Sequence, residues 1–127
     1  MDVFGPGWAE HWKKIESNWR QRISEQDLVL IPGDLSWGMR EPEAEKDLRW
    51  LEALPGIKVV TKGNHDYWWQ SVSKIRKAYP GIRFLQNDSV LVNGVGICGT
   101  RGWTIPSGEQ VSEQDQKMYL REQQRLQ

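Results

Sequence analysis

The sequence predicts an α/β fold, built mainly of parallel β-α-β units that are followed by a β-hairpin and a C-terminal helix. Two short apolar runs, 28–31 and 57–61, each end just before a glycine and polar residues, as buried strands do. A helical pattern of apolar residues separates the two runs, which is the order of a parallel unit with a right-handed crossover. Farther along, Asn93-Gly94 separates two more apolar runs, and this dipeptide favours a two-residue hairpin turn.

The first predicted helix is amphipathic and rich in tryptophan. It follows the helix-breaking segment Phe4-Gly5-Pro6-Gly7, and its apolar stripe is Trp8, Trp12, Ile15, Trp19 and Ile23. We favour the interpretation that these tryptophans pack the helix onto a sheet. Exposed aromatic residues among basic ones would instead suit base stacking on a nucleic acid, but the regularity of the stripe argues against exposure.

The later elements follow from similar patterns. The second helix begins near Pro42, which suits a first turn, and its apolar side is Ala44, Leu48, Leu51 and Leu54. The third helix has the stripe Trp68, Val72, Ile75 and Tyr79, and Pro-Gly pairs at 55–56 and 80–81 end the two helices. A short third strand over 82–85 precedes the hairpin of 90–92 and 95–98, and a polar loop covers 99–103. From Ser112 the chain is polar and helix-prone, with the weak stripe Met118, Leu120 and Leu126.

Composition bounds the class of protein. A chain of 127 residues suits a single domain, 1–127. Lysine and arginine number 17, as do aspartate and glutamate, so no net charge attracts polyanions, and a nucleic-acid partner is disfavoured. Cys98 is the single cysteine, which excludes an internal disulfide or a thiolate metal cluster; we expect a reducing, cytoplasmic setting and a core role for Cys98. No apolar run approaches the roughly 20 residues that cross a bilayer, so we expect no membrane partner.

Polar residues that can bind metals or move protons follow both strands. Asp34 comes after Gly33, and Asn64, His65 and Asp66 come after Gly63. Open α/β sheets bind ligands beyond the carboxyl ends of their strands, so we expect these four side chains to meet in one crevice. There the carboxylate of Asp34 can bridge two cations, and the carbonyl oxygen of Asn64 can ligate one of them. The imidazole of His65 can protonate a leaving alkoxide, and Asp66 can orient that imidazole.

These residues also have structural interpretations. Asp34 taken alone would be a turn aspartate at a strand end, and Asn64 or Asp66 could cap the next helix. Both roles can hold together for Asn64 or Asp66. For His65 the structural interpretation fits less well, because packing does not explain a histidine in a polar cluster at a strand end.

The motifs resemble those of the calcineurin-like metallophosphoesterases. That family has Gly-Asp and Gly-Asn-His-Asp/Glu motifs, which are similar to Gly33-Asp34 and residues 63–66 here. More closely, 27–37, 54–69 and 98–103 resemble a bacterial branch of predicted phosphohydrolases. The resemblance implies part of the family's sandwich fold and metal-dependent hydrolysis of small phosphate esters. It also implies that Asp34 bridges two divalent ions (manganese, iron, zinc or similar), that Asn64 binds one of them, and that His65 is the proton donor.

Arg101 is a candidate for substrate binding. A guanidinium in a loop after a strand can clamp a phosphate through two hydrogen bonds. An arginine there can equally pair with a nearby acid, and the sequence does not separate the two interpretations.

The chain also departs from the family pattern. The family has an Asp-x-His motif after its first strand and later histidines, including a Gly-His-x-His motif, whereas this sequence has only His11 and His65. His11 lies on the flank of the first helix's stripe, so we expect it to be a partly packed helix residue rather than a ligand. We therefore expect 1–127 to be an incomplete domain, an internal portion of such an enzyme, with little or no phosphatase activity alone.

An incomplete domain would have physical consequences. A parallel sheet that lacks a strand exposes an edge, and part of the tryptophan helix would lack a partner surface. This predicts marginal stability or self-association through the exposed edge. An alternative function follows from it, in which the chain is a non-catalytic fragment that serves as a binding or interaction module.

Overall fold

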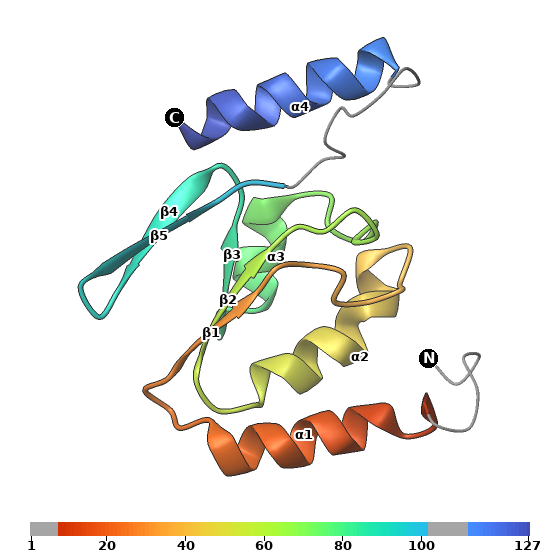
Figure 1. The fold of residues 1–127 in the computed structure, drawn as a ribbon. Coiled ribbons are helices and arrows are strands. Elements are labelled where there is room, and N and C mark those ends of the chain that lie inside the picture. The colour runs from red at the N-terminus through yellow and green to blue at the C-terminus, as the bar shows by residue number, and fades with distance from the viewer. Residues whose placement is uncertain (1–7, 102–111) are drawn as a thin grey trace.

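The computed structural model describes residues 8–101 and 112–127 and confirms the α/β prediction. Segments 1–7 and 102–111 lie outside the described residues, and with them the predicted break at 4–7 and the end of the predicted loop 99–103. Figure 1 shows the arrangement of the elements, which are α1 His11–Arg22, β1 Leu28–Ile31, α2 Glu41–Glu52, β2 Ile57–Thr61, α3 Val72–Ala78, β3 Ile82–Leu85, β4 Asp88–Val92, β5 Val95–Gly99 and α4 Glu113–Leu126.

The strands form a parallel sheet and a separate hairpin. The sheet has the order β1-β2-β3, with Leu28 opposite Ile57 and Lys58 opposite Ile82. The hairpin pairs β4 with β5, and its turn residues Asn93 and Gly94 have φ angles of 50° and 79°, the positive values that a type I′ turn requires. Because β1 and β2 run in the same direction, their carboxyl ends open into loops at the same edge of the sheet.

The sheet is packed on both faces. Val59 and Val60 are neighbours in β2 and point to opposite faces, as strand geometry requires. Val60 belongs to the larger cluster, which α2 and α3 complete with Leu48, Leu51, Ile75 and others. Val59 belongs to a smaller cluster that includes Val92 of the hairpin. The apolar side predicted for α2 is confirmed, since Ala44, Leu48, Leu51 and Leu54 are all buried.

The packing predicted for α1 is wrong in its main feature. The helix lies along α2 instead of on the sheet (Figure 1), and none of its residues is buried. Trp19 is the main contact: it packs half-buried against the larger cluster and donates from Nε1 to the carbonyl oxygen of Pro55 at 2.8 Å. Trp8 and Trp12 remain 43% and 50% exposed. The stripe thus predicted a helix, although α1 begins after Trp8 and ends before Ile23, and only Trp19 and Ile23 of the stripe are partly covered.

Two further elements differ in detail from expectation. Trp68 is buried, but in the turn before α3, which begins at Val72. Helix α4 is polar as expected, with Leu120 and Leu126 exposed, and Ser112 caps it by accepting from the Asp115 amide at 3.1 Å. Among the described residues no helix is long and apolar enough to span a bilayer.

Candidate functional site

Two glycines bring the loops after β1 and β2 into backbone contact. Gly33 has a φ angle of 106°, and a Cβ atom placed on it would lie 2.2 Å from the Gly63 nitrogen. A Cβ on Gly63 would in turn lie 2.2 Å from Oδ1 of Asp34. Such separations are far inside van der Waals contact, so the site requires the absence of a side chain at both positions. This close approach places Asp34 beside the Asn64-His65 pair.

Asp34 is held in an exposed, ionised state. Its φ angle of 55° lies in the left-handed region, which aspartate tolerates better than most residues. Oδ1 accepts from the backbone amide of His65 at 2.9 Å, and Oδ2 lies 3.2 Å from the Nδ1 atom of His65. These two hydrogen bonds lower the pKa of Asp34, and the positive charge of Arg101 lowers it further. The side chain remains 48% exposed, so a negative oxygen pair is available to a ligand.

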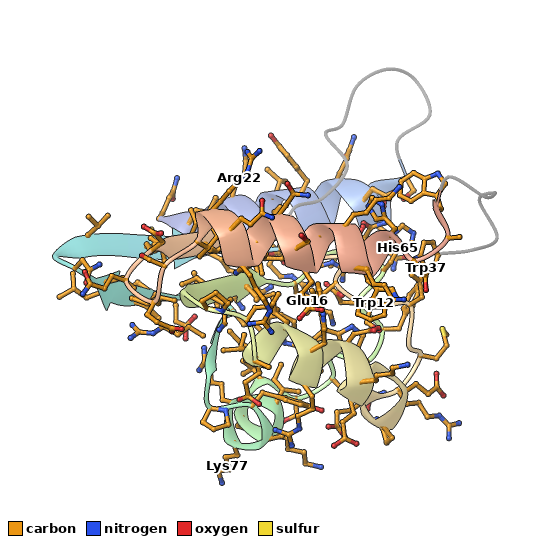
Figure 2. The ribbon with its side chains drawn as sticks, turned by 90° about the horizontal axis from the view of Figure 1, so that it is seen from below. Trp12, Glu16, Arg22, Trp37, His65 and Lys77 are labelled. Atoms are coloured by element: carbon orange, nitrogen blue, oxygen red, sulfur yellow. The ribbon has the colours of Figure 1, made fainter. Side chains whose placement is uncertain are left out.

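The imidazole of His65 lies between Asp34 and Asn64. The amide nitrogen of Asn64 is 3.4 Å from Nε2 of His65. An amide NH₂ group can only donate, so in a neutral ring Nε2 accepts and Nδ1 carries the proton toward Asp34. Trp37 stacks on the imidazole at a centroid distance of 5.7 Å, and Tyr67 meets it edge-on at 6.2 Å. Figure 2 shows His65 and Trp37 together at one end of the molecule.

The role that the sequence suggested for Asp66 does not match the geometry. Its side chain is 1% exposed and contacts the backbone instead of the imidazole of His65. It accepts from the amides of Asp34 and Gly63, each at 2.8 Å, from the amide of Leu35 at 2.9 Å, and from the indole of Trp68 at 3.1 Å. The buried carboxylate of Asp66 therefore holds the two loops together, while Asp34 is the carboxylate that contacts the imidazole.

A pocket of about 450 Å³ adjoins this cluster and contains Arg101 and an unexpected lysine. Lys62, Asn64, Tyr67, Trp69 and Arg101 are among the residues that line it. The Nζ atom of Lys62 donates to the carbonyl oxygen of Trp69 at 2.7 Å. Burial lowers the pKa of Lys62 and the nearby charge of Arg101 lowers it further, while the carboxylate of Asp66 raises it. Sequence analysis did not single out Lys62, although its position between a strand end and Gly63 was a usable signal.

A family model described as calcineurin-like phosphoesterase matches residues 6–126. The chain belongs to the calcineurin-like phosphoesterase family. No curated protein matches the chain. Calcineurin-like phosphoesterases act on phosphate esters and generally use divalent metals, which agrees with the coarse chemistry predicted from the motifs.

The described residues fit a calcineurin-like metal centre only in part. The ionised carboxylate of Asp34 and the amide oxygen of Asn64 are oxygen donors of the kind that divalent ions accept. Within 8–101 and 112–127, however, no three histidine, cysteine, aspartate or glutamate side chains gather into a metal-binding group. His11 is no exception, since its ring contacts Trp8 at 4.7 Å. These residues therefore suit one side of a metal site and do not form the ligand shell of two ions.

Proposed function

We propose that this chain takes part in metal-dependent hydrolysis of small phosphate esters at a two-metal centre, of which it supplies Asp34, Asn64 and His65. One observation carries the proposal: an ionised, exposed carboxylate contacts an imidazole at the carboxyl ends of two parallel strands. The family match over residues 6–126 supports the same class of reaction. Divalent metal ions, when bound at such a site, activate water and offset the negative charge of the phosphate.

Asp34, Asn64 and His65 each have a separate role in this proposal. Asp34 would hold the metal ions, and two hydrogen bonds from His65 keep its carboxylate ionised and oriented for that role. Asn64 contacts His65 through its amide nitrogen, which leaves the carbonyl oxygen of the same amide to ligate one ion. His65 is the general acid, and its Nδ1–H is held by Asp34. When the ring is protonated, Nε2 gives up its contact with the Asn64 amide and donates its proton to the leaving oxygen.

The test combines metal binding with turnover in the whole chain. We expect Mn²⁺ binding, measured by electron paramagnetic resonance, and slow manganese-dependent hydrolysis of p-nitrophenyl phosphate. The turnover is slow because the described residues provide an incomplete ligand shell. Asp34→Asn should abolish both signals, whereas Asp88→Asn, which changes another partly exposed aspartate that pairs with Arg76, should abolish neither. A chain that binds no Mn²⁺, or hydrolysis that persists in Asp34→Asn, would contradict the proposal.

A second candidate function is that of a non-catalytic interaction module. It is favoured by the exposure of large apolar side chains away from the site, notably Trp12 at 50% and Leu30 at 59%. The two functions make opposite predictions for metal. An interaction module would fold and associate without binding Mn²⁺, and Asp34→Asn would leave its properties unchanged.

A further inference from the structure

Two cationic side chains share one pocket beside the proposed metal ligands. Lys62 and Arg101 both line the pocket of about 450 Å³, and Asn64 lies on its wall. Lys62 is fixed in place by its hydrogen bond to the carbonyl oxygen of Trp69, 2.7 Å away. The charge of Arg101 lowers the pKa of both Asp34 and Lys62, so the guanidinium acts electrostatically on both side chains.

Like charges in a partly desolvated pocket raise each other's energy, and an anion between them removes that cost. The carboxylate of Asp66 also lines the pocket, and its charge, which raises the pKa of Lys62, offsets part of that cost. Its two oxygens accept hydrogen bonds from three backbone amides and one indole, so Asp66 is held in place by other groups. Tetrahedral oxyanions suit this arrangement, because a guanidinium offers a planar pair of donors and an ammonium offers a compact charge.

We propose that Lys62 acts with Arg101 to bind the non-bridging oxygens of the substrate's phosphate in this pocket. The inference rests on the proposed function and deepens it, since it places the phosphate on the Asn64 side of the cluster and adds Lys62 to the substrate-binding residues. A purely structural role is the competing explanation for Lys62, because its hydrogen bond also supports the loop that carries Trp69.

The experiment titrates the whole chain with inorganic phosphate in the presence of a chelator, so that no metal contributes. The Trp69 indole signal in a ¹⁵N NMR spectrum reports binding, because Trp69 lines the pocket and its Nε1–H has a defined partner in Gln86. We expect Lys62→Gln and Arg101→Gln each to weaken phosphate binding about tenfold or more, the effect of losing one charge-assisted hydrogen bond.

The controls remove equal charge elsewhere. Figure 2 shows Lys77 and Arg22 well away from His65, so Lys77→Gln and Arg22→Gln should change phosphate affinity less than about twofold. Lys62→Arg retains the charge and a donor, and we expect it to bind phosphate within about threefold of the unchanged chain. Equal weakening in all the glutamine variants, or unchanged affinity in Lys62→Gln, would overturn the proposal. Reduced thermal stability in Lys62→Gln with unchanged phosphate affinity would assign Lys62 the structural role and overturn it as well.

Failure of this inference is distinguishable from failure of the proposed function. Asp34→Asn should abolish Mn²⁺ binding, yet it should keep or strengthen phosphate binding, because it removes a negative charge near Arg101. Phosphate binding without Mn²⁺ binding would support the pocket and count against the metal centre. Mn²⁺ binding without phosphate binding would support the metal centre and count against the phosphate pocket.

Discussion

Asp34 lies in the loop after β1 and Asp66 in the loop after β2, and the two carboxylates have opposite physical roles. Asp66 is buried and accepts hydrogen bonds from both loops, whereas the carboxylate of Asp34 is half exposed and faces outward. The sequence predicted that both residues lie near His65. It assigned the contact with the imidazole to Asp66, whereas Asp34 makes that contact. A motif shows which loops meet but not which N–H groups face each carboxylate oxygen.

The contrast between the two aspartates is testable by removing one charge at a time. In Asp66→Asn an NH₂ group faces backbone N–H donors, so we expect the free energy of unfolding to fall by about 3 kcal/mol. Asp34→Asn should cost less than about 1 kcal/mol, since the site is exposed and asparagine tolerates a φ angle of 55°. Urea denaturation measures both values. Similar losses in the two variants would contradict the structural role of Asp66.

Tyr79 makes the free energy of unfolding depend on pH in the alkaline range. The side chain is fully buried and donates from its hydroxyl to Glu41 at 2.7 Å; burial, followed by this hydrogen bond, raises the pKa of Tyr79. A pKa raised by folding gives stability that is complete below the unfolded value, near 10, and is lost as the pH rises above it. We expect Tyr79→Phe to be about 1 kcal/mol less stable at neutral pH. This difference in the free energy of unfolding should narrow above a pH of about 10. A difference that widened there would contradict the raised pKa of Tyr79.

At the scale of elements, the site depends on how closely two strand ends approach. Gly63 has no room for a methyl group, since its Cβ would lie 2.4 Å from the Asp34 nitrogen. We expect Gly63→Ala to displace Asp34, abolish Mn²⁺ binding and reduce stability by about 2 kcal/mol or more. Gly96→Ala is the matched control, because a Cβ on this β5 residue meets nothing within 4 Å. Wild-type Mn²⁺ affinity in Gly63→Ala would show that the loops can separate without losing the site.

Sequence patterns predicted the elements well and their partners less well. The spacing of Ala44, Leu48 and Leu51 predicted the buried side of α2, because a sheet-packed helix buries a continuous stripe. The stripe of α1 was equally regular, yet Trp12 is exposed and Trp19 packs half-buried against the larger cluster. Periodicity predicts that a helix has an apolar side, but the available partner surface decides how much of that side is covered.

At the scale of the whole molecule, β1 is the least protected part of the parallel sheet. It pairs with β2 on one edge, and no strand among the described residues pairs with the other. Leu30 lies on the same face as Leu28 by strand alternation, but it remains 59% exposed. An open parallel edge with an exposed apolar side chain favours pairing with another chain.

We therefore expect self-association that depends on this strand. The weight-average mass from sedimentation should rise with protein concentration, and Leu30→Lys should weaken association about tenfold or more, since a charge on an edge strand opposes pairing. Leu126→Lys is the matched control, because Leu126 of α4 is equally exposed at 59%. Association that is insensitive to Leu30→Lys, or a mass that stays constant with concentration, would exclude the β1 edge as the interface.

The hydrogen bonds to Asp66 also have a consequence for dynamics. The amides of Asp34, Leu35 and Gly63 belong to two loops 28 residues or more apart in sequence, yet they donate to one carboxylate. Loop amides ordinarily exchange with deuterium independently and fast, whereas these three share one acceptor, so loss of that acceptor exposes all of them at once. We infer that they exchange with one common opening free energy, and that the two loops behave as a single cooperative unit in native-state hydrogen exchange.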